Sequence, residues 1–364
     1  MPFTKTFGTT SGAYSTATLW KPIDVTNPLY AWTASGSGTN EYYLRTAAAA
    51  DPGFVAQPAN VYINGSNATE GTMGSLTAGQ FDYGDNDTLG YSTIYVRLSD
   101  GTDPDTKDPN YVKFYQIPQA TEHVRFAPES ASITSATGLD QSGVAIGDFI
   151  VEEGYQGLIG SATLGYLYID PDRFEFHGSG EAWLHIGAAA IAPQIYDTAS
   201  PQAGERGLYL CGSAMSVLNV MGGSVGIAVR PGETSTITTA RALDGSLWLG
   251  NGVTATNLHA YDGEARVRCA VTTTIQYGGE ITSEENGTMT TVTQHGGDYV
   301  YQSTGNITTH NFYGGTFDEQ QSGAARTVGT RNKYRGSGRI LRNKEAVTVT
   351  TEVTQESYTE IIST

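Results

Sequence analysis

Four groups of acidic residues are the first candidates for chemistry in this chain: Glu152–Glu153, Asp170 with Asp172 and Glu175, Glu284–Glu285, and Asp318–Glu319. A glycosidase uses two carboxyl groups about 5 Å or about 6.5–9.5 Å apart on either side of the scissile bond. Adjacent residues on a strand point to opposite faces, so sequence adjacency alone does not build such a pair. The chain has 37 acidic residues, so such clusters arise by chance. We therefore predict no catalytic residues and no enzyme activity.

Two acidic loops in the first third of the chain could supply oxygen ligands to calcium. They run from Asp82 to Asp87 and from Asp100 to Asp105, and Asp108 follows the second. Calcium takes about six to eight oxygens, but neither loop has the glutamate that ends an EF-hand loop. Asp-Gly and Asp-Pro also form ordinary turns. The six histidines lack metal-ligand spacing. We predict turns with no metal or cofactor, and calcium remains the alternative.

A basic segment from Ala324 to Lys344 stands out in a chain of net charge −17, because it contains no acidic residue. It could dock electrostatically onto an acidic partner, either another copy of the chain or a particle beneath it. Alternatively, its charges keep the end of the fold soluble and prevent edge pairing. Both interpretations stay open. The candidate interaction residues are Arg326, Arg331, Lys333, Arg335, Arg339, Arg342 and Lys344.

The composition indicates which elements must position these residues. Among 364 residues there are 45 Gly and 48 Thr, and only 16% are charged, against roughly 25% in ordinary soluble domains. Gly and Thr disfavour helix, whereas Thr favours strands, so we expect a β-rich, extended protein. The net charge of −17 argues against nucleic acid as a partner. No apolar stretch is long enough to span a membrane, and Cys211 and Cys269 are expected to be buried thiols.

A repeated phrase of bulky residues followed by a glycine turn runs through the second half of the chain. Successive turns end 22, 18, 16, 18, 18 and 21 residues apart, and apolar residues alternate on both sides. Evenly spaced hairpins of a β-sandwich are the less favoured alternative. We predict a parallel β-helix with about 16–22 residues per coil, whose corners need glycine for positive φ or close backbone approach. The predicted corners are Gly223, Gly245, Gly263, Gly279, Gly297, Gly315 and Gly336.

These patterns predict an all-β chain with an antiparallel domain before the solenoid. Residues 1–27 have few apolar anchors and are expected to form an extended arm. Alternating aromatic and polar residues predict a sandwich-like attachment domain over 28–117, and a Ser/Thr/Ala/Gly-rich connector over 118–146 follows. The parallel β-helix is predicted over 147–340. A C-terminal cap over 341–364 would cover its last edge.

Several segments resemble a family of tailed-bacteriophage virion proteins, and the resemblance covers nearly the whole chain. They read EEGYQGLIG at 152–160 and GERGLYL at 204–210, before the Thr-Thr…Tyr-Gly-Gly coils. In the front domain they read WTASGSGTNEYYL at 32–44 and IYVRLSDGTDP at 94–104. Such proteins pair a small β domain with a parallel β-helix.

The resemblance implies a structural component of the virion, assembled in the cytoplasm of the host bacterium. It implies a homotrimer that binds other virion proteins such as the major capsid protein, without nucleic acid or membrane as partners. A short solenoid without a carboxylate constellation favours a capsid decoration protein or head fibre. The alternative is a tailspike or tail-fibre receptor-binding protein that recognises, and in some cases cleaves, a host-surface glycan. A third possibility is a tail-tube or baseplate component.

Overall fold

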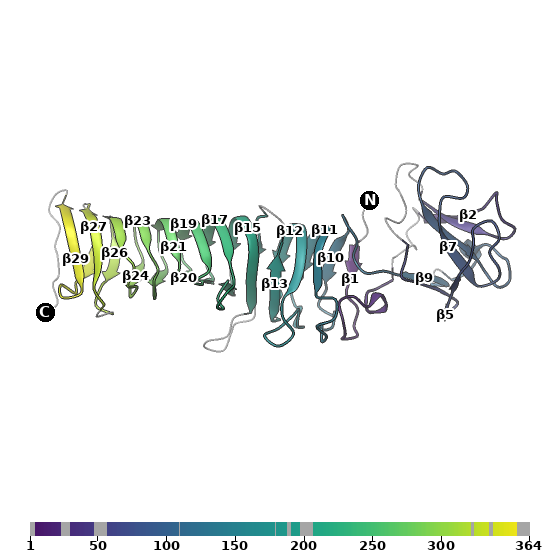
Figure 1. Cartoon of the computed structure of the whole chain (residues 1–364), viewed down its shortest axis with the longest axis horizontal. Coiled ribbons are helices and arrows are strands. Elements are labelled where there is room, and N and C mark those ends of the chain that lie inside the picture. Colours follow the sequence, from purple (N-terminus) through teal and green to yellow (C-terminus); the bar gives the residue numbers. More distant parts are fainter. Residues whose placement is uncertain are drawn as a thin grey trace.

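A computed structural model shows an elongated all-β protein, with a small domain at one end and a long solenoid beyond it (Figure 1). Strands make up 53% of the chain and helices 2%. The solenoid makes about nine turns between residues 167 and 354, which confirms the predicted fold class. The structure describes residues 4–22, 30–46, 57–108, 110–178, 180–187, 191–196, 207–321, 324–334 and 338–354.

The small domain contains two mainly antiparallel sheets packed around an apolar core. The larger sheet has the order β2-β3-β8-β7-β6 and the smaller one β5-β4-β9. Alternation places Val61, Ile94 and Phe114 inside with no exposed surface. Its elements are β2 (Tyr30–Ala34), β3 (Tyr42–Thr46), β4 (Asn60–Ile63), β5 (Ser66–Asn67), β6 (Thr69–Glu70), β7 (Gln80–Gly84), β8 (Thr93–Arg97), the 3₁₀ helix η2 (Pro104–Thr106) and β9 (Val112–Tyr115).

The N-terminal residues cap the solenoid, so the predicted extended arm is wrong for residues 4–22. Strand β1 (Thr4–Thr6) pairs in parallel with β10 (His123–Phe126), and the 3₁₀ helix η1 (Ala17–Leu19) follows it. Phe7, Tyr14 and Trp20 are at most 1% exposed. The Trp20 indole lies edge-on to both other rings, and its Nε1 donates to the Tyr14 carbonyl at 2.8 Å. Three widely spaced aromatics are enough to anchor this segment. Residues 1–3 and 23–27 lie outside the described residues.

The predicted connector over 118–146 also proves to be part of the stacked structure. Strand β10 pairs with β11 (Asp140–Val151), and β11 pairs with the first strand of the regular solenoid. Between them, Ile133 forms a parallel bridge with Gly12 and is fully buried. The many Ser, Thr and Gly residues between short apolar pairs concealed these strands, because no run of alternation is long enough to be recognised.

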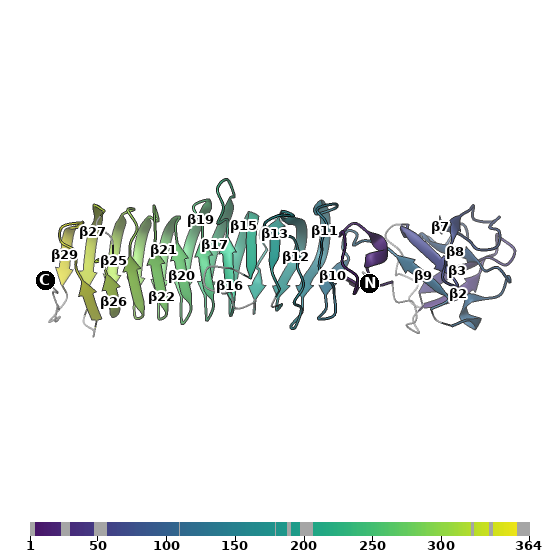
Figure 2. The ribbon, with the colours of Figure 1, turned by 90° about the horizontal axis from the view of Figure 1, so that it is seen from below.

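The solenoid is a stack of parallel coils in which long and short strands form separate ladders (Figure 2). Its first strands are less regular: β12 (Leu167–Phe176), β13 (Ala182–Ile186), β14 (Gln194–Ile195) and β15 (Leu208–Val220). The long strands that follow are β17 (Ser235–Ala242), β19 (Val253–Ala260), β21 (Ala270–Gln276), β23 (Met289–Gln294), β25 (Ile307–Phe312), β27 (Arg326–Lys333) and β29 (Val347–Thr354). The short strands are β16 (Ser224–Ile227), β18 (Ser246–Leu249), β20 (Glu264–Val267), β22 (Glu280–Ser283), β24 (Asp298–Tyr301), β26 (Gly315–Asp318) and β28 (Gly338–Leu341).

The pairing register gives the coil length directly. Glu264 pairs with Glu280, 16 residues on, whereas Gly315 pairs with Gly338, 23 residues on. The other steps fall between these limits, close to the predicted range. The longest step contains residues 335–337, outside the described part of the chain, and with them the predicted corner Gly336.

The corner glycines are needed for two different reasons. Gly223, Gly279, Gly297 and Gly315 have positive φ, between 63° and 86°. Gly263 does not, but a Cβ there would lie 2.4 Å from the carbonyl oxygen of Gly245 in the preceding coil. Both reasons were anticipated from the spacing, because coils that stack at roughly 4.8 Å leave no room for a side chain between corner backbones.

Each long strand skips one pairing position, so a row of side chains turns outward between its two halves. In β19 and β21, Ala255 pairs with Val271 and Asn257 with Thr273, while the intervening residues are left out of the register. The same omission recurs in the neighbouring coils. The side chains at this position are exposed and share one residue type; we call Thr238, Thr256, Thr272, Thr290 and Thr308 the threonine row.

Candidate functional site

The structure separates the candidate catalytic carboxylates and gives each its own partner. Glu152 accepts a hydrogen bond from Arg125 Nε at 2.5 Å, and Glu175 accepts one from Arg173 at 2.5 Å. The Asp170 carboxylate accepts the backbone N–H of Gly143 at 2.8 Å, and Asp318 accepts that of Gln320 at 2.8 Å. Glu319 pairs with the buried Arg331.

One shallow hollow of about 360 Å³ does contain two of these candidates. Ile150, Glu152, Glu153 and His177 line it. However, Glu152 is held by its arginine, and the His177 ring is stacked on Tyr196 with centroids 4.1 Å apart. Glu153 lies on the exposed side. The hollow therefore offers no pair of carboxyl groups facing each other across a substrate.

The first acidic loop uses its carboxylates to hold backbone turns. Asp82 accepts the N–H of Met73 at 2.9 Å. Asp85 accepts those of Leu89 and Gly90 at 2.6 and 2.8 Å. Asp87 reaches across to another loop, where it accepts the N–H of Gly36 at 2.7 Å and the hydroxyl of Ser35 at 2.8 Å. Oxygens that accept N–H groups in this way point away from a common centre.

The second acidic loop is organised in the same manner. Asp100 accepts hydrogen bonds from Lys107 and from the Thr102 hydroxyl at 2.5 and 2.7 Å, and these contacts hold its pKa well below the usual range. Asp103 caps η2 by accepting the N–H of Asp105 at 2.9 Å. Asp108 accepts the N–H of Asn110. Within the described residues, no group of three or more His, Cys, Asp and Glu side chains is placed to hold a metal ion.

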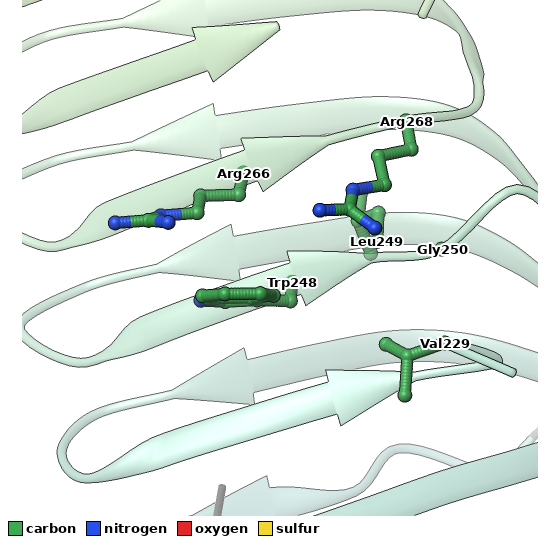
Figure 3. Close-up of a pocket in the computed structure, with 6 residues that line it drawn as sticks. All are labelled: Val229, Trp248, Leu249, Gly250, Arg266 and Arg268. Atoms are coloured by element: carbon green, nitrogen blue, oxygen red, sulfur yellow. The ribbon is translucent and has the colours of Figure 1, made fainter. Parts of the chain in front are cut away.

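The most sharply formed recess lies on the short-strand face and was not anticipated (Figure 3). It encloses about 40 Å³, room for only a few water molecules. The register stacks Trp248 directly below Arg266, and the guanidinium carbon lies 4.6 Å from the indole centroid. This arrangement depends on an 18-residue step between coils, so the sequence shows it only once the register is known. The recess is lined by Val229, Trp248, Leu249, Gly250, Arg266 and Arg268.

Three glutamates neutralise the arginines of this recess. Arg266 Nε donates to Glu264 at 2.5 Å, which raises the pKa of that guanidinium. Arg268 Nε donates to Glu284 at 2.9 Å, and its Nη1 lies 3.1 Å from Glu285. Two of the candidate catalytic carboxylates thus serve as counter-ions. The recess can hold a small planar or polar group against the indole edge, but it lacks the net positive charge that would concentrate anions.

An aromatic ladder runs along one corner of the solenoid. It consists of Tyr261, Tyr277, His295, Tyr313 and Tyr334, with successive centroids 5.0, 5.4, 4.8 and 4.1 Å apart and ring planes within 20° of parallel. The expected stacking of His295 with its tyrosine neighbours is confirmed. Because each ring covers the face of the next, the ladder presents mainly ring edges and hydroxyl groups to solvent.

The basic segment does not form the exposed patch that its sequence suggests. Arg326, Arg331 and Lys333 are at most 3% exposed, because they point into the last coils. Arg331 pairs with Glu319, Lys333 pairs with Glu352, and Arg326 donates to the backbone carbonyls of Tyr301 and Glu319. As surface docking residues, these three were predicted wrongly. The alternation of the strand turned them inward, toward acids outside the segment.

The rest of the segment is divided between an ion pair and solvent. Arg342 donates to Glu352 at 2.5 Å. Arg339 and Lys344 are exposed, and Arg335 lies outside the described residues. A docking role therefore falls to at most these last three positions.

The two cysteines are buried and free, as expected. Burial raises the pKa of each thiol to about 12, so neither is a reactive thiolate at neutral pH.

Comparison with known proteins adds no relative: the chain matches no protein-family model, no curated protein and no solved structure. Across the described residues, no helix has the length and apolar character needed to span a bilayer.

Proposed function

We propose that this chain is a non-enzymatic structural component of a tailed-phage virion, a capsid decoration protein or head fibre. The observation that carries the proposal is the architecture: a small β domain sits at one end of a rigid solenoid (Figure 1). The candidate carboxylates support a structural role, because they are engaged in ion pairs and turns. The sequence resemblance to virion proteins points in the same direction.

In this proposal the two parts divide the work. The small domain attaches to the particle, with the major capsid protein as its partner, and the solenoid projects outward. Nine turns at roughly 4.8 Å make a rod about 43 Å long. The chain acts as a homo-oligomer, as a trimer in the favoured form, and is assembled in the host cytoplasm.

The experiment that tests this function is to locate the protein on purified particles. Electron microscopy with antibody labelling should place it on the head, and a quantitative gel should show many copies per particle. Its absence from purified virions would overturn the proposal. Labelling confined to the tail, with few copies, would transfer the chain to the alternative role.

The alternative is a tailspike or tail-fibre protein that binds a host-surface glycan. The recess at Trp248 favours it, because an aromatic ring beside arginine and glutamate side chains is suited to contact sugars. Binding of the purified chain to host polysaccharide, lost in Trp248→Ala and retained in Tyr196→Ala, would support this role. Release of oligosaccharides would show in addition that the chain cleaves glycan.

A further inference from the structure

Acidic residues avoid one side of the solenoid entirely. Between Ser235 and Gln320, none of the nine acids lies in a long strand. They occupy the short strands and the corners beside them, whereas the long strands in this region carry one arginine, Arg241. The nine acids are Asp244, Asp262, Glu264, Glu280, Glu284, Glu285, Asp298, Asp318 and Glu319.

The acid-free side is also chemically uniform. The threonine row lies at its centre, and the residues one step further along each strand are Thr239, Asn257, Thr273, Thr291 and Thr309. These align from coil to coil through the register of the long strands. We call this side, with the threonine row as its midline, the threonine face.

The β propensity of threonine explains part of this pattern but not the missing charges. Thr is common in exposed strand positions because a branched side chain suits the pleat. Exposed sheets, however, ordinarily carry charges that oppose association. At 16% charged residues, roughly three of the eighteen outward positions nearest the midline of β17 to β27 should be charged, and none is. A surface that must stay in water has no reason to exclude charge so completely.

We propose that the threonine face is the surface on which a second copy of this chain lies, side by side and parallel. Two copies with a net charge of −17 each repel one another wherever their acids meet. Threonine face against threonine face is the approach that avoids this repulsion. Charged residues are likewise depleted at the centres of protein interfaces. The inference supplies a surface for the self-association in the proposed function and in that respect rests on it.

The geometry of the face suits this partner. Sheets pack face to face at about 10 Å, and threonine presents a methyl group for packing beside a hydroxyl that both donates and accepts. About 43 Å of solenoid and roughly 13 Å of strand width give about 600 Å² per copy, or 1,200 Å² in total. That area lies at the lower bound of stable interfaces. Parallel alignment also brings the small domains to the same end, where they can attach together (Figure 1).

The test is the mass of the purified full-length chain by size-exclusion chromatography with light scattering. Wild type should have a small multiple of 38.6 kDa. Thr272→Arg combined with Thr290→Arg adds two charges per copy to the threonine face and should give a single-chain mass. Thr316→Arg, on the short strand β26, is the matched control and should keep the mass of wild type.

Three results would overturn the inference: a monomeric wild type, a double variant of unchanged mass, or a control that dissociates as fully as the double variant. If the double variant does not fold, as judged by circular dichroism, cross-linking decides. Thr290→Cys with a short bis-maleimide should give linked chains, whereas Thr316→Cys should not, and the reverse would contradict the proposal. These measurements need no particle, so a wrong location on the virion would leave them intact.

Discussion

A fully buried arginine lies in the last coils of the solenoid, where an apolar residue would be expected. In the register, Arg331 follows His310 and Val292 in the same inward-facing column. It is 0% exposed and is neutralised by Glu319 from the short-strand side, itself 1% exposed. Removing one partner of such a pair strands the other charge in a medium that cannot solvate it.

The first prediction concerns this pair. Glu319→Gln should lower the free energy of unfolding by about 3–5 kcal/mol, measured by denaturant titration at neutral pH. Asp318→Asn, at the neighbouring half-buried position, is the control and should cost less than about 1 kcal/mol. An equal loss in both variants would show that the pair does not stabilise the last coils.

The second prediction concerns His310, whose ring nitrogens have no hydrogen-bond partner in the described chain. Burial, together with the nearby charge of Arg331, lowers the pKa of this imidazole well below 6.5. The unfolded chain therefore binds a proton near pH 6.5 that the folded chain refuses, and stability falls as the pH drops below that value. Between about pH 6.5 and pH 5 this single group should cost about 2 kcal/mol.

A variant isolates that contribution. His310→Phe should flatten the stability profile over this range, as measured by thermal or denaturant unfolding at several pH values. His295→Phe, in the exposed aromatic ladder, should leave the profile as in wild type. Identical profiles for wild type and His310→Phe would contradict the prediction.

At the scale of single elements, the corners show how closely the coils approach. A Cβ at Gly297, where φ is 73°, would lie 2.4 Å from the carbonyl oxygen of Gly279. At Gly232, φ is 85° but no atom lies within 4 Å of the same position. The two glycines share the backbone requirement and differ in crowding.

The third prediction follows from that difference. Gly232→Ala should lower the free energy of unfolding by about 1 kcal/mol, the cost of a left-handed conformation for alanine. Gly297→Ala should cost more than twice as much, because the coil below must also move. Urea titration of both variants checks this, and equal costs would mean that stacking does not constrain the corner.

The elements differ in how much of them could be predicted from sequence. The coils from Gly223 to Gly315 were predictable, because a step of 16–22 residues recurs with alternating apolar side chains. The capping segment with Phe7, Tyr14 and Trp20 was not, since its partner β10 lies more than a hundred residues away. No local pattern reports such a contact.

The candidate sites failed for a related reason. Arg326, Arg331 and Lys333 look like a surface patch along the chain, but the register turns them toward Glu319 and Glu352. The recess at Trp248 exists only because coils one step apart place Arg266 above it. Stacking creates such neighbours, and they become visible only when the coil length is known for each turn.

At the scale of the whole molecule, charge is sorted across the solenoid. The acids of residues 235–320 lie on the short-strand side and the corners, opposite the threonine face. Association through that face therefore works against the long-range repulsion of the remaining charge, which dissolved salt screens over about 8 Å at physiological ionic strength.

The fourth prediction is a salt dependence of self-association. Raising the ionic strength from low to physiological values should lower the dissociation constant between copies, as measured by sedimentation velocity. The Thr316→Arg control should show the same trend. Weaker association in salt would indicate that ion pairs, rather than the uncharged threonine face, hold the copies together.

The pairing of β1 with β10 also fixes how the chain is assembled over time. Thr4–Thr6 leaves the ribosome first but cannot find its neighbour until His123–Phe126 has been made. Everything between is in effect a guest inserted into the end loop of the solenoid, with Lys21 of the outgoing chain paired to Glu129 after its return, at 2.5 Å. Such a guest can be exchanged: replacing residues 30–116 by a short flexible linker should leave the circular dichroism of a folded solenoid. New attachment modules could then be grafted onto the same rod without altering a single rung.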